Sequence, residues 1–213
     1  MLVGDAAAWT TRFTTFDERF LERVIEVWPL CVAVLLGQPE EDAITINLVH
    51  HLGKDPVVRR LCHWIEYQYE PFGLAADGSR YSKGKIDLVA LFDRERERYL
   101  AYECKRLNVV NAGSRSSLAT VYVTQGMMRF ITEQYAKELP LGCMLGYVMD
   151  ADVAFALSRV NGAIKAHPQL MLQDGPTTIC PIQGVSRFQT SHIRHGGGSM
   201  EIRHALLSFR EPT

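Results

Sequence analysis

The sequence predicts an α/β fold: a mixed central β-sheet flanked by helices on both faces, closed by a C-terminal β-hairpin. The chain has 213 residues, and 47% of them are hydrophobic, which is enough for one well-filled core. Segments with helical periodicity and segments with strand periodicity follow one another along the chain. Two pairs of strand-like segments are joined by short polar turns, which indicates antiparallel hairpins within the sheet.

The first third of the chain has helical patterns. Apolar residues at helical spacing follow Thr14 and Thr15, which are candidate N-caps, and predict an amphipathic helix that bends or stops at Pro29. A second helix is expected from Pro39, because proline suits a first helical turn. The carboxylates that follow it are Glu40, Glu41 and Asp42. Residues 55–64 predict one further short helix.

Strand patterns dominate the middle of the chain. Residues 65–71 alternate between apolar and polar side chains, as a half-buried strand does, and residues 73–84 form a polar loop. Residues 85–92 and 98–107 are two apolar segments around a charged turn, which predicts an antiparallel hairpin. Residues 108–117 are rich in glycine and serine and are expected to be a loop.

The last third returns to alternating helices and strands. Residues 118–139 predict a long helix, and residues 142–149 predict a buried strand. A helix is then expected to begin at Asp150 or Asp152, either of which can act as its cap. Residues 187–209 contain two strand patterns around a GGGS turn and predict a terminal hairpin.

Bulk properties restrict the class of protein. The formal charge of -1 and the pI near 6.7 argue against a histone-like or membrane-surface binder, but not against nucleic acid held on a local basic face. The five widely spaced cysteines, without a CxxC pair, indicate reduced intracellular thiols. No signal peptide is evident, and the longest apolar run is too short to span a bilayer. We expect one cytoplasmic domain over residues 1–213, with an N-terminal helical segment at 1–38.

Charged residues on the predicted central hairpin indicate chemistry. Asp87 interrupts an otherwise apolar strand, and Glu103 and Lys105 share one face of the next strand because side chains alternate. Two carboxylates held close together need a compensating cation, and oxygen ligands suit Mg²⁺ or Mn²⁺. The backbone carbonyl of Cys104 is a further candidate ligand, and Glu41 at the start of the second helix is another.

These residues resemble the catalytic hairpin of the PD-(D/E)xK nuclease superfamily, which has the restriction-endonuclease-like fold. The resemblance covers residues 39–209, the expected nuclease core, and rests on about five positions. It implies that Asp87 and Glu103 bind Mg²⁺ and that Lys105 activates the attacking water. Ile86 stands where the family name has proline, a common departure that leaves the role of Asp87 intact.

The resemblance also implies roles for two helices. A glutamate of the first core helix contributes to the site, which Glu41 or Glu40 would match, although Glu40 is the better candidate for a charge that complements the helix dipole. Gln125 resembles a glutamine of the following helix and would orient the lysine–carboxylate cluster or a phosphate. Arg129 lies four residues further and is expected on the same helix face.

Nucleic acid is the expected partner. The candidate contacts to its backbone are Lys83, Lys85, Arg106, Arg115, Arg129, His192 and Arg194. His192 and Arg194 lie two apart on one predicted strand, where facing phosphate competes evenly with simple exposure. No sequence-reading module is evident, so a homodimer or a targeting protein supplies specificity, or cleavage has little sequence preference.

The leading functional hypothesis is a Mg²⁺-dependent DNA endonuclease, in bacterial defence or mobile-element biology. DNA versus RNA, and endonuclease versus exonuclease, stay open at the level of sequence. One alternative is a catalytically silent subunit of the same fold that binds nucleic acid or supports assembly. Another is a small-molecule α/β enzyme in which Glu103 and Lys105 form a merely structural pair.

Overall fold

A seven-stranded mixed sheet forms the centre of the computed structural model, which describes residues 6–137, 139–179 and 185–209. The strand order is β1-β4-β5-β8-β11-β10-β9. The strands are β1 (Trp64–Tyr69), β4 (Ile86–Leu91), β5 (Tyr99–Leu107), β8 (Leu141–Val148), β9 (Leu172–Thr178), β10 (Val185–Ile193) and β11 (Ser199–Ser208). β8 pairs parallel with β5 and β11, and every other neighbouring pair is antiparallel. The α/β class and the C-terminal hairpin, β10–β11, are therefore confirmed.

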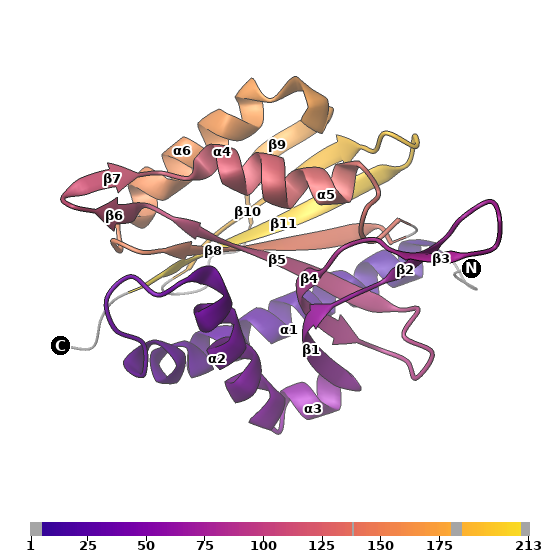
Figure 1. Cartoon of the computed structure of the whole chain (residues 1–213), viewed down its shortest axis with the longest axis horizontal. Helices are drawn as coiled ribbons and strands as arrows, with labels where there is room; N and C mark the ends of the chain where they lie inside the picture. The colour runs from indigo at the N-terminus through magenta and orange to yellow at the C-terminus, as the bar shows by residue number, and fades with distance from the viewer. Residues whose placement is uncertain (1–5, 138, 180–184, 210–213) are drawn as a thin grey trace.

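Helices cover both faces of this sheet (Figure 1). The helices on one side are α1 (Ala6–Ala33), α2 (Glu41–Lys54) and α3 (Val58–Leu61). The other side carries α4 (Ala119–Val121), the π-helix η1 (Tyr122–Met127), α5 (Met128–Ile131) and α6 (Val153–Ala166). A 3-10 turn, η2 (Pro168–Leu170), leads into β9. Among the described residues, no helix combines the length and the apolar character needed to cross a membrane.

The first helix is longer than the sequence pattern predicts. It begins at Ala6 rather than at Thr14 or Thr15, and it continues past Pro29 to Ala33. The proline removes only one backbone hydrogen bond near the end of the helix, while the buried side chains of Cys31 and Val32 hold the last turn against the core. α1 also supplies several buried aromatic rings, so residues 1–38 include a part of the core.

The start of α6 is as the sequence predicts, whereas the helix before it ends earlier than predicted. α6 has Asp152 as its N-cap, whose carboxylate accepts a hydrogen bond from the backbone N–H of Phe155 at 3.1 Å, as one of the two predicted caps should. The helix predicted over residues 118–139 ends at Ile131 instead. Glu133 and Ala136 have positive φ values of 60° and 52°, which no regular helix tolerates.

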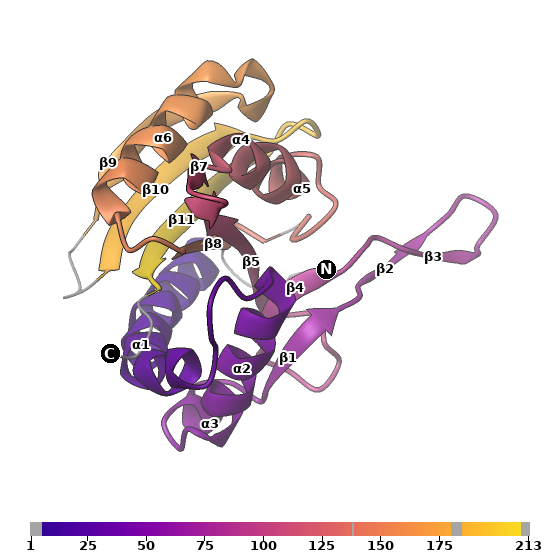
Figure 2. The same ribbon diagram turned by 60° about the vertical axis from the view of Figure 1, so that its left-hand side comes forward.

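Two hairpins and one edge strand lie where the sequence predicts loops or gives no strand signal. β2 (Phe72–Leu74) and β3 (Arg80–Ser82) form a hairpin that projects from the body of the molecule (Figure 2). β6 (Val109–Asn111) and β7 (Ser114–Ser116) form another. Their strands are three residues long and mostly exposed, so they are too short to show the apolar alternation by which strands are predicted. β9 is an edge strand without that alternation.

Cysteine residues are confirmed as free thiols within the described ranges. Cys31, Cys62, Cys104 and Cys143 are buried and unpaired with one another. The fifth, Cys180, lies outside the described residues.

A buried chain of polar groups joins the second half of the sheet to η1. The His204 ring stacks on Phe188 at 4.2 Å and contacts the hydroxyl of Tyr122 at 2.9 Å and that of Thr190 at 3.0 Å. His192 contacts the same Thr190 hydroxyl at 2.7 Å. Burial lowers the pKa of His204 well below its usual value and also lowers that of His192.

These histidines predict acid sensitivity. Because the folded state holds them neutral, their contribution to stability is complete above pH ~6.5, the pKa of an unfolded histidine, and is lost as the pH falls below it. We expect the free energy of unfolding to fall between pH 7.5 and 5.5, and to fall less in His204→Gln. Urea denaturation at both pH values measures this, and an equal loss in the variant would contradict the assignment.

Candidate active site

The β4–β5 hairpin places two carboxylates side by side. Leu88 pairs with Tyr102 in antiparallel register, so one position further along the pair Asp87 comes to lie opposite Glu103. The backbone N–H of Cys104 donates a hydrogen bond to Oδ2 of Asp87 at 2.8 Å, which joins the two strands at this point. Tyr102 points to the opposite face, where its hydroxyl contacts Asp17 of α1 at 3.1 Å. Strand alternation therefore assigns Glu103 and Lys105 to one face, as the sequence pattern predicts.

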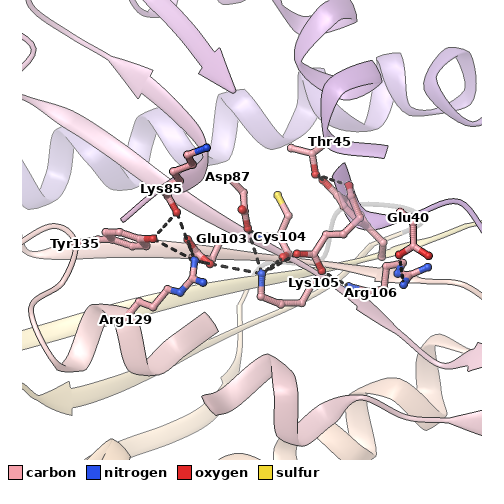
Figure 3. A network of polar contacts seen from close by, with 12 residues as sticks. Glu40, Thr45, Lys85, Asp87, Glu103, Cys104, Lys105, Arg106, Arg129 and Tyr135 are labelled. Carbon is pink, nitrogen blue, oxygen red and sulfur yellow. Dashed lines mark hydrogen bonds and ion pairs between the residues drawn. The ribbon is translucent and has the colours of Figure 1, made fainter. Parts of the chain in front are cut away.

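Lys105 lies at the centre of the cluster (Figure 3). Its Nζ is 2.8 Å from Oε1 of Glu41, 3.2 Å from Oδ2 of Asp87 and 3.6 Å from Oε2 of Glu103. The ammonium also donates to the carbonyl oxygen of Cys104 at 2.5 Å. One cation thus contacts carboxylates from α2, β4 and β5, and all the residues predicted as metal ligands gather around it.

The helix glutamate in this cluster is Glu41, not Glu40. Glu41 is the first residue of α2, and its second carboxylate oxygen accepts a hydrogen bond from the backbone N–H of Arg106 at 3.0 Å. Glu40 forms an ion pair with the Arg106 guanidinium instead, and 78% of its side chain is exposed. Glu40 has an extended backbone and Glu41 is the first helical residue, so the two adjacent side chains reach different partners.

Glu103 forms the floor of the site. Its side chain is completely buried and receives the Arg129 guanidinium at 3.0 Å on Oε2 and 3.2 Å on Oε1. The same guanidinium contacts the hydroxyl of Tyr135 at 3.1 Å, and that hydroxyl donates to the backbone carbonyl of Lys85. This chain of contacts fixes Glu103 against the start of β4.

Burial and charge alter the titration of the central groups. Burial, reinforced by the neighbouring Asp87, raises the pKa of Glu103 to about 8, against the opposing effect of Lys105 and Arg129. Burial tends to lower the pKa of Lys105, but the carboxylates of Asp87, Glu103 and Glu41 outweigh it and raise that pKa. Lys105 therefore stays an ammonium at neutral pH and acts as a hydrogen-bond donor and cation rather than as a base.

The cluster opens to solvent on one side. The exposed fraction of the side chain is 28% for Glu41 and 15% for Asp87, against 8% for Lys105. The described contacts of Asp87 all involve Oδ2, so Oδ1 accepts no hydrogen bond from another described residue. An incoming ligand therefore meets Asp87 and Glu41 first.

Gln125 lies apart from the cluster in the described structure. It is exposed and forms no hydrogen bond with the described residues of the site. Instead it lines a cleft of about 460 Å³ between η1, α5 and η2, which Arg129 also lines. Gly126 of η1 lies beside the cluster instead: a Cβ added there would lie 3.6 Å from Cγ of Lys105. The π-helical turn, a feature frequent at functional sites, changes the face that a regular helix would present.

The predicted basic contacts divide into two groups. Lys85 is exposed, and its Nζ contacts the Gln68 side chain at 3.3 Å, while Lys83 is half-buried at the base of the β2–β3 hairpin. Arg106 and Arg115 are instead paired: Arg115 contacts Asp150 at 2.8 Å and Asp152 at 3.1 Å. Arg129 belongs to the cluster itself, through Glu103.

The prediction that His192 and Arg194 face phosphate is wrong. Both residues are buried, with 1% and 4% of their surface exposed. His192 contacts the backbone carbonyl of Leu170 at 2.8 Å, and Arg194 donates to the backbone carbonyls of Lys137 and Leu139. Their polar groups satisfy buried backbone atoms, which the alternating strand pattern could not distinguish from surface exposure.

Sequence reasoning missed two residues of the site. Tyr135 follows the helix end in a segment without a motif, so nothing in the sequence indicates its contact with Arg129. Gly126 had a detectable signal, because a glycine inside a helical pattern is costly and indicates a close contact.

Comparison with known protein families, with curated proteins and with solved structures finds no match to this chain.

Proposed function

We propose that this chain is a divalent-metal-dependent nuclease that hydrolyses phosphodiester bonds in DNA as an endonuclease. The observation that carries the proposal is the position of Lys105, whose ammonium contacts carboxylates of Glu41, Asp87 and Glu103 from three separate elements. A cluster of buried charges of this kind is costly for folding, and a chain with a purely structural need would be served by apolar residues.

The donor atoms fit Mg²⁺ or Mn²⁺. Asp87, Glu103 and the carbonyl of Cys104 offer oxygen only, which is the ligand that these hard cations prefer, and Oδ1 of Asp87 is free of protein partners among the described residues. Within the described residues no group of three or more His, Cys, Asp or Glu side chains is arranged to hold a metal by itself. Mg²⁺ commonly uses one or two carboxylates, with waters and substrate phosphates completing its shell, so this arrangement agrees with its chemistry.

Asp87 and Glu103 would hold the ion with the Cys104 carbonyl, and Glu41 would join directly or through water. When bound, the ion would supply charge that stabilises the developing negative charge on the phosphoryl oxygens. Glu41 lies at the open side of the cluster, where its carboxylate can accept a hydrogen bond from the attacking water. Lys105 would orient that water by donating to its oxygen and would offset charge at phosphorus. The water oxygen bonds to phosphorus and one of its protons passes to the Glu41 carboxylate, while the bond from phosphorus to the leaving sugar oxygen breaks and that oxygen takes a proton from solvent water.

The setting of the reaction is part of the proposal. Lys83 and Lys85, next to the cluster in sequence, would contact the DNA backbone, so binding is expected to be modest and sensitive to salt. Gln125 and Arg129 would meet substrate through the cleft that both line. Targeting would come from a second copy or a partner protein, in the cytoplasm and in a defence or mobile-element context.

A nuclease assay on a panel of substrates tests the proposal. The panel holds supercoiled plasmid, linear duplex, single-stranded DNA and RNA, each with Mg²⁺, with Mn²⁺ and with EDTA. We expect cleavage of DNA only with a divalent ion. Metal binding without cleavage of any substrate would favour the catalytically silent, nucleic-acid-binding subunit. No metal binding by calorimetry would count heavily against the nuclease.

The adjacent glutamates supply a matched pair of variants for this assay. Glu41→Gln is expected to reduce the rate of cleavage by about 10²-fold, because it removes the charge that faces Lys105. Glu40→Gln should keep nearly the wild-type rate, since Glu40 contacts only Arg106 at the surface. Equal rates in the two variants would exclude Glu41 from the site.

A further inference from the structure

A cleft lined by arginine and aromatic residues lies between α1, α3 and the end of β4. It consists of two adjoining hollows of about 350 and 230 Å³ that share Arg12, Leu61 and Phe92. The remaining lining residues are Thr11, Thr15, Phe16, Arg19, Arg59, Arg60, Cys62 and His63. The chain has 24 Asp and Glu residues and a formal charge of -1, yet the described residues of this lining include arginine and histidine and no acid.

Two arginines of this cleft are unpaired within the described part of the chain. Arg23, Arg115 and Arg129 each form ion pairs with a carboxylate. Arg19 and Arg60, by contrast, have no side-chain hydrogen bond or ion pair with any residue in the described part of the chain. Glu22, one turn along α1 from Arg19, forms no ion pair with it among the described contacts. The guanidinium groups are therefore available to an outside anion.

The carboxylate nearest in sequence to Arg59 and Arg60, that of Asp55, already has partners within the chain. Asp55 contacts Arg23 at 2.6 Å and accepts hydrogen bonds from the backbone N–H groups of Val57 and Val58. Arg59 is held in place by a bond from its Nε to the carbonyl of Gly53 at 2.9 Å, which leaves its terminal nitrogens free to contact a ligand. The planar guanidinium fork matches phosphate oxygens, which makes phosphate the anion of choice.

The two hollows have different chemistry. The larger one combines Phe16, Leu61 and Phe92 with the hydroxyls of Thr11 and Thr15. The smaller one carries Arg59, Arg60 and His63 beside the same Leu61 and Phe92. A ligand with an apolar ring system and a phosphate group would use both parts, and their size is that of a small-molecule site.

We propose that this cleft binds a nucleotide, with its phosphate between Arg19, Arg59 and Arg60 and its base toward Leu61 and Phe92. The site is separate from the catalytic cluster. Phe92 follows the end of β4 that lies away from Asp87, and its ring packs on Phe13 and Phe16 of α1 at 5.5 and 4.8 Å. The proposal does not depend on the proposed nuclease activity.

Calorimetric titration with ATP and with adenosine, in EDTA, tests the site. We expect ATP to bind and adenosine to bind far more weakly. Arg19→Ser combined with Arg60→Ser should weaken ATP binding about tenfold or more, because charge-assisted hydrogen bonds to the phosphate are lost. These side chains are exposed, so the variant should fold, and its thermal midpoint checks this.

The matched control is Arg80→Ser combined with Arg159→Ser. These arginines, on β3 and α6, are exposed and likewise have no side-chain partner in the described part of the chain, so ATP affinity should stay unchanged. Glu103→Gln should also keep it. Competition with a 5′-phosphorylated oligonucleotide separates the sources: displacement of ATP assigns the phosphate to a strand end, and its failure to a free nucleotide. Equal ATP binding in the two arginine variants, or equal binding of adenosine, would overturn the proposal.

Discussion

Lys105→Met is expected to reduce the rate of phosphodiester hydrolysis by about 10²- to 10⁴-fold. The substitution removes the only cation that contacts Glu41 and Asp87 together in the described structure, while it keeps most of the volume of the side chain. With the ammonium gone, nothing at that position can donate to the attacking water or offset charge at phosphorus. Single-turnover cleavage of duplex DNA at saturating Mg²⁺ measures the loss.

The same substitution also affects folding, so catalysis and stability must be separated. Without the Lys105 ammonium, the carboxylates of Glu41, Asp87 and Glu103 lose the cation that they share. Losing one partner of a buried ion pair costs ~3–5 kcal/mol. Lys105→Met combined with Glu103→Gln removes one negative charge with the positive one and should recover part of the free energy of unfolding. It should recover none of the activity. A double variant that cleaves DNA at the wild-type rate would contradict a role for Lys105 in the reaction.

The central part of the candidate site is predictable from the sequence because its residues lie on two consecutive strands. Strand alternation assigns Glu103 and Lys105 to one face, and an acid in the apolar strand before the turn comes to lie beside them. Glu41 joins them over a larger separation along the chain, and its contact with Lys105 at 2.8 Å follows from the position of α2. The residue types alone indicated Glu41 or Glu40, and only the start of the helix decides between them.

The rest of the site depends on packing that no local pattern records. Arg129 is predicted to contact nucleic acid, and its guanidinium also pairs with the buried Glu103, a contact that no sequence pattern indicates. Arg194 has the composition of a surface cation, yet it donates hydrogen bonds to the backbone carbonyls of Lys137 and Leu139. The glycine, serine and aspartate residues of residues 73–84 predict a loop, and the β2–β3 hairpin found there exposes Phe72 and Leu74 rather than packing them in a core.

Asp17→Ala is expected to destabilise the protein by ~3–5 kcal/mol, as much as the loss of Lys105. Asp17 lies on the buried face of α1, where its carboxylate contacts Arg203 at 2.9 Å and Arg187 at 3.3 Å. It also accepts a hydrogen bond from the Tyr102 hydroxyl at 3.1 Å. One side chain therefore joins α1 to β5, β10 and β11, and its loss leaves two buried guanidinium groups without their shared carboxylate.

The neighbouring Glu18 supplies the control, because it contacts the same Arg203 at 3.3 Å but is 48% exposed. Glu18→Ala should cost less than ~1 kcal/mol, as surface ion pairs do. Urea denaturation of both variants at pH 7 measures the difference. If the two variants unfold at the same urea concentration, α1 is not held to the sheet by its buried charge, and its aromatic residues alone must carry that contact. Because Arg187 and Arg203 lie on the opposite half of the sheet from Asp87, we expect metal binding by the folded Asp17→Ala protein to be unchanged.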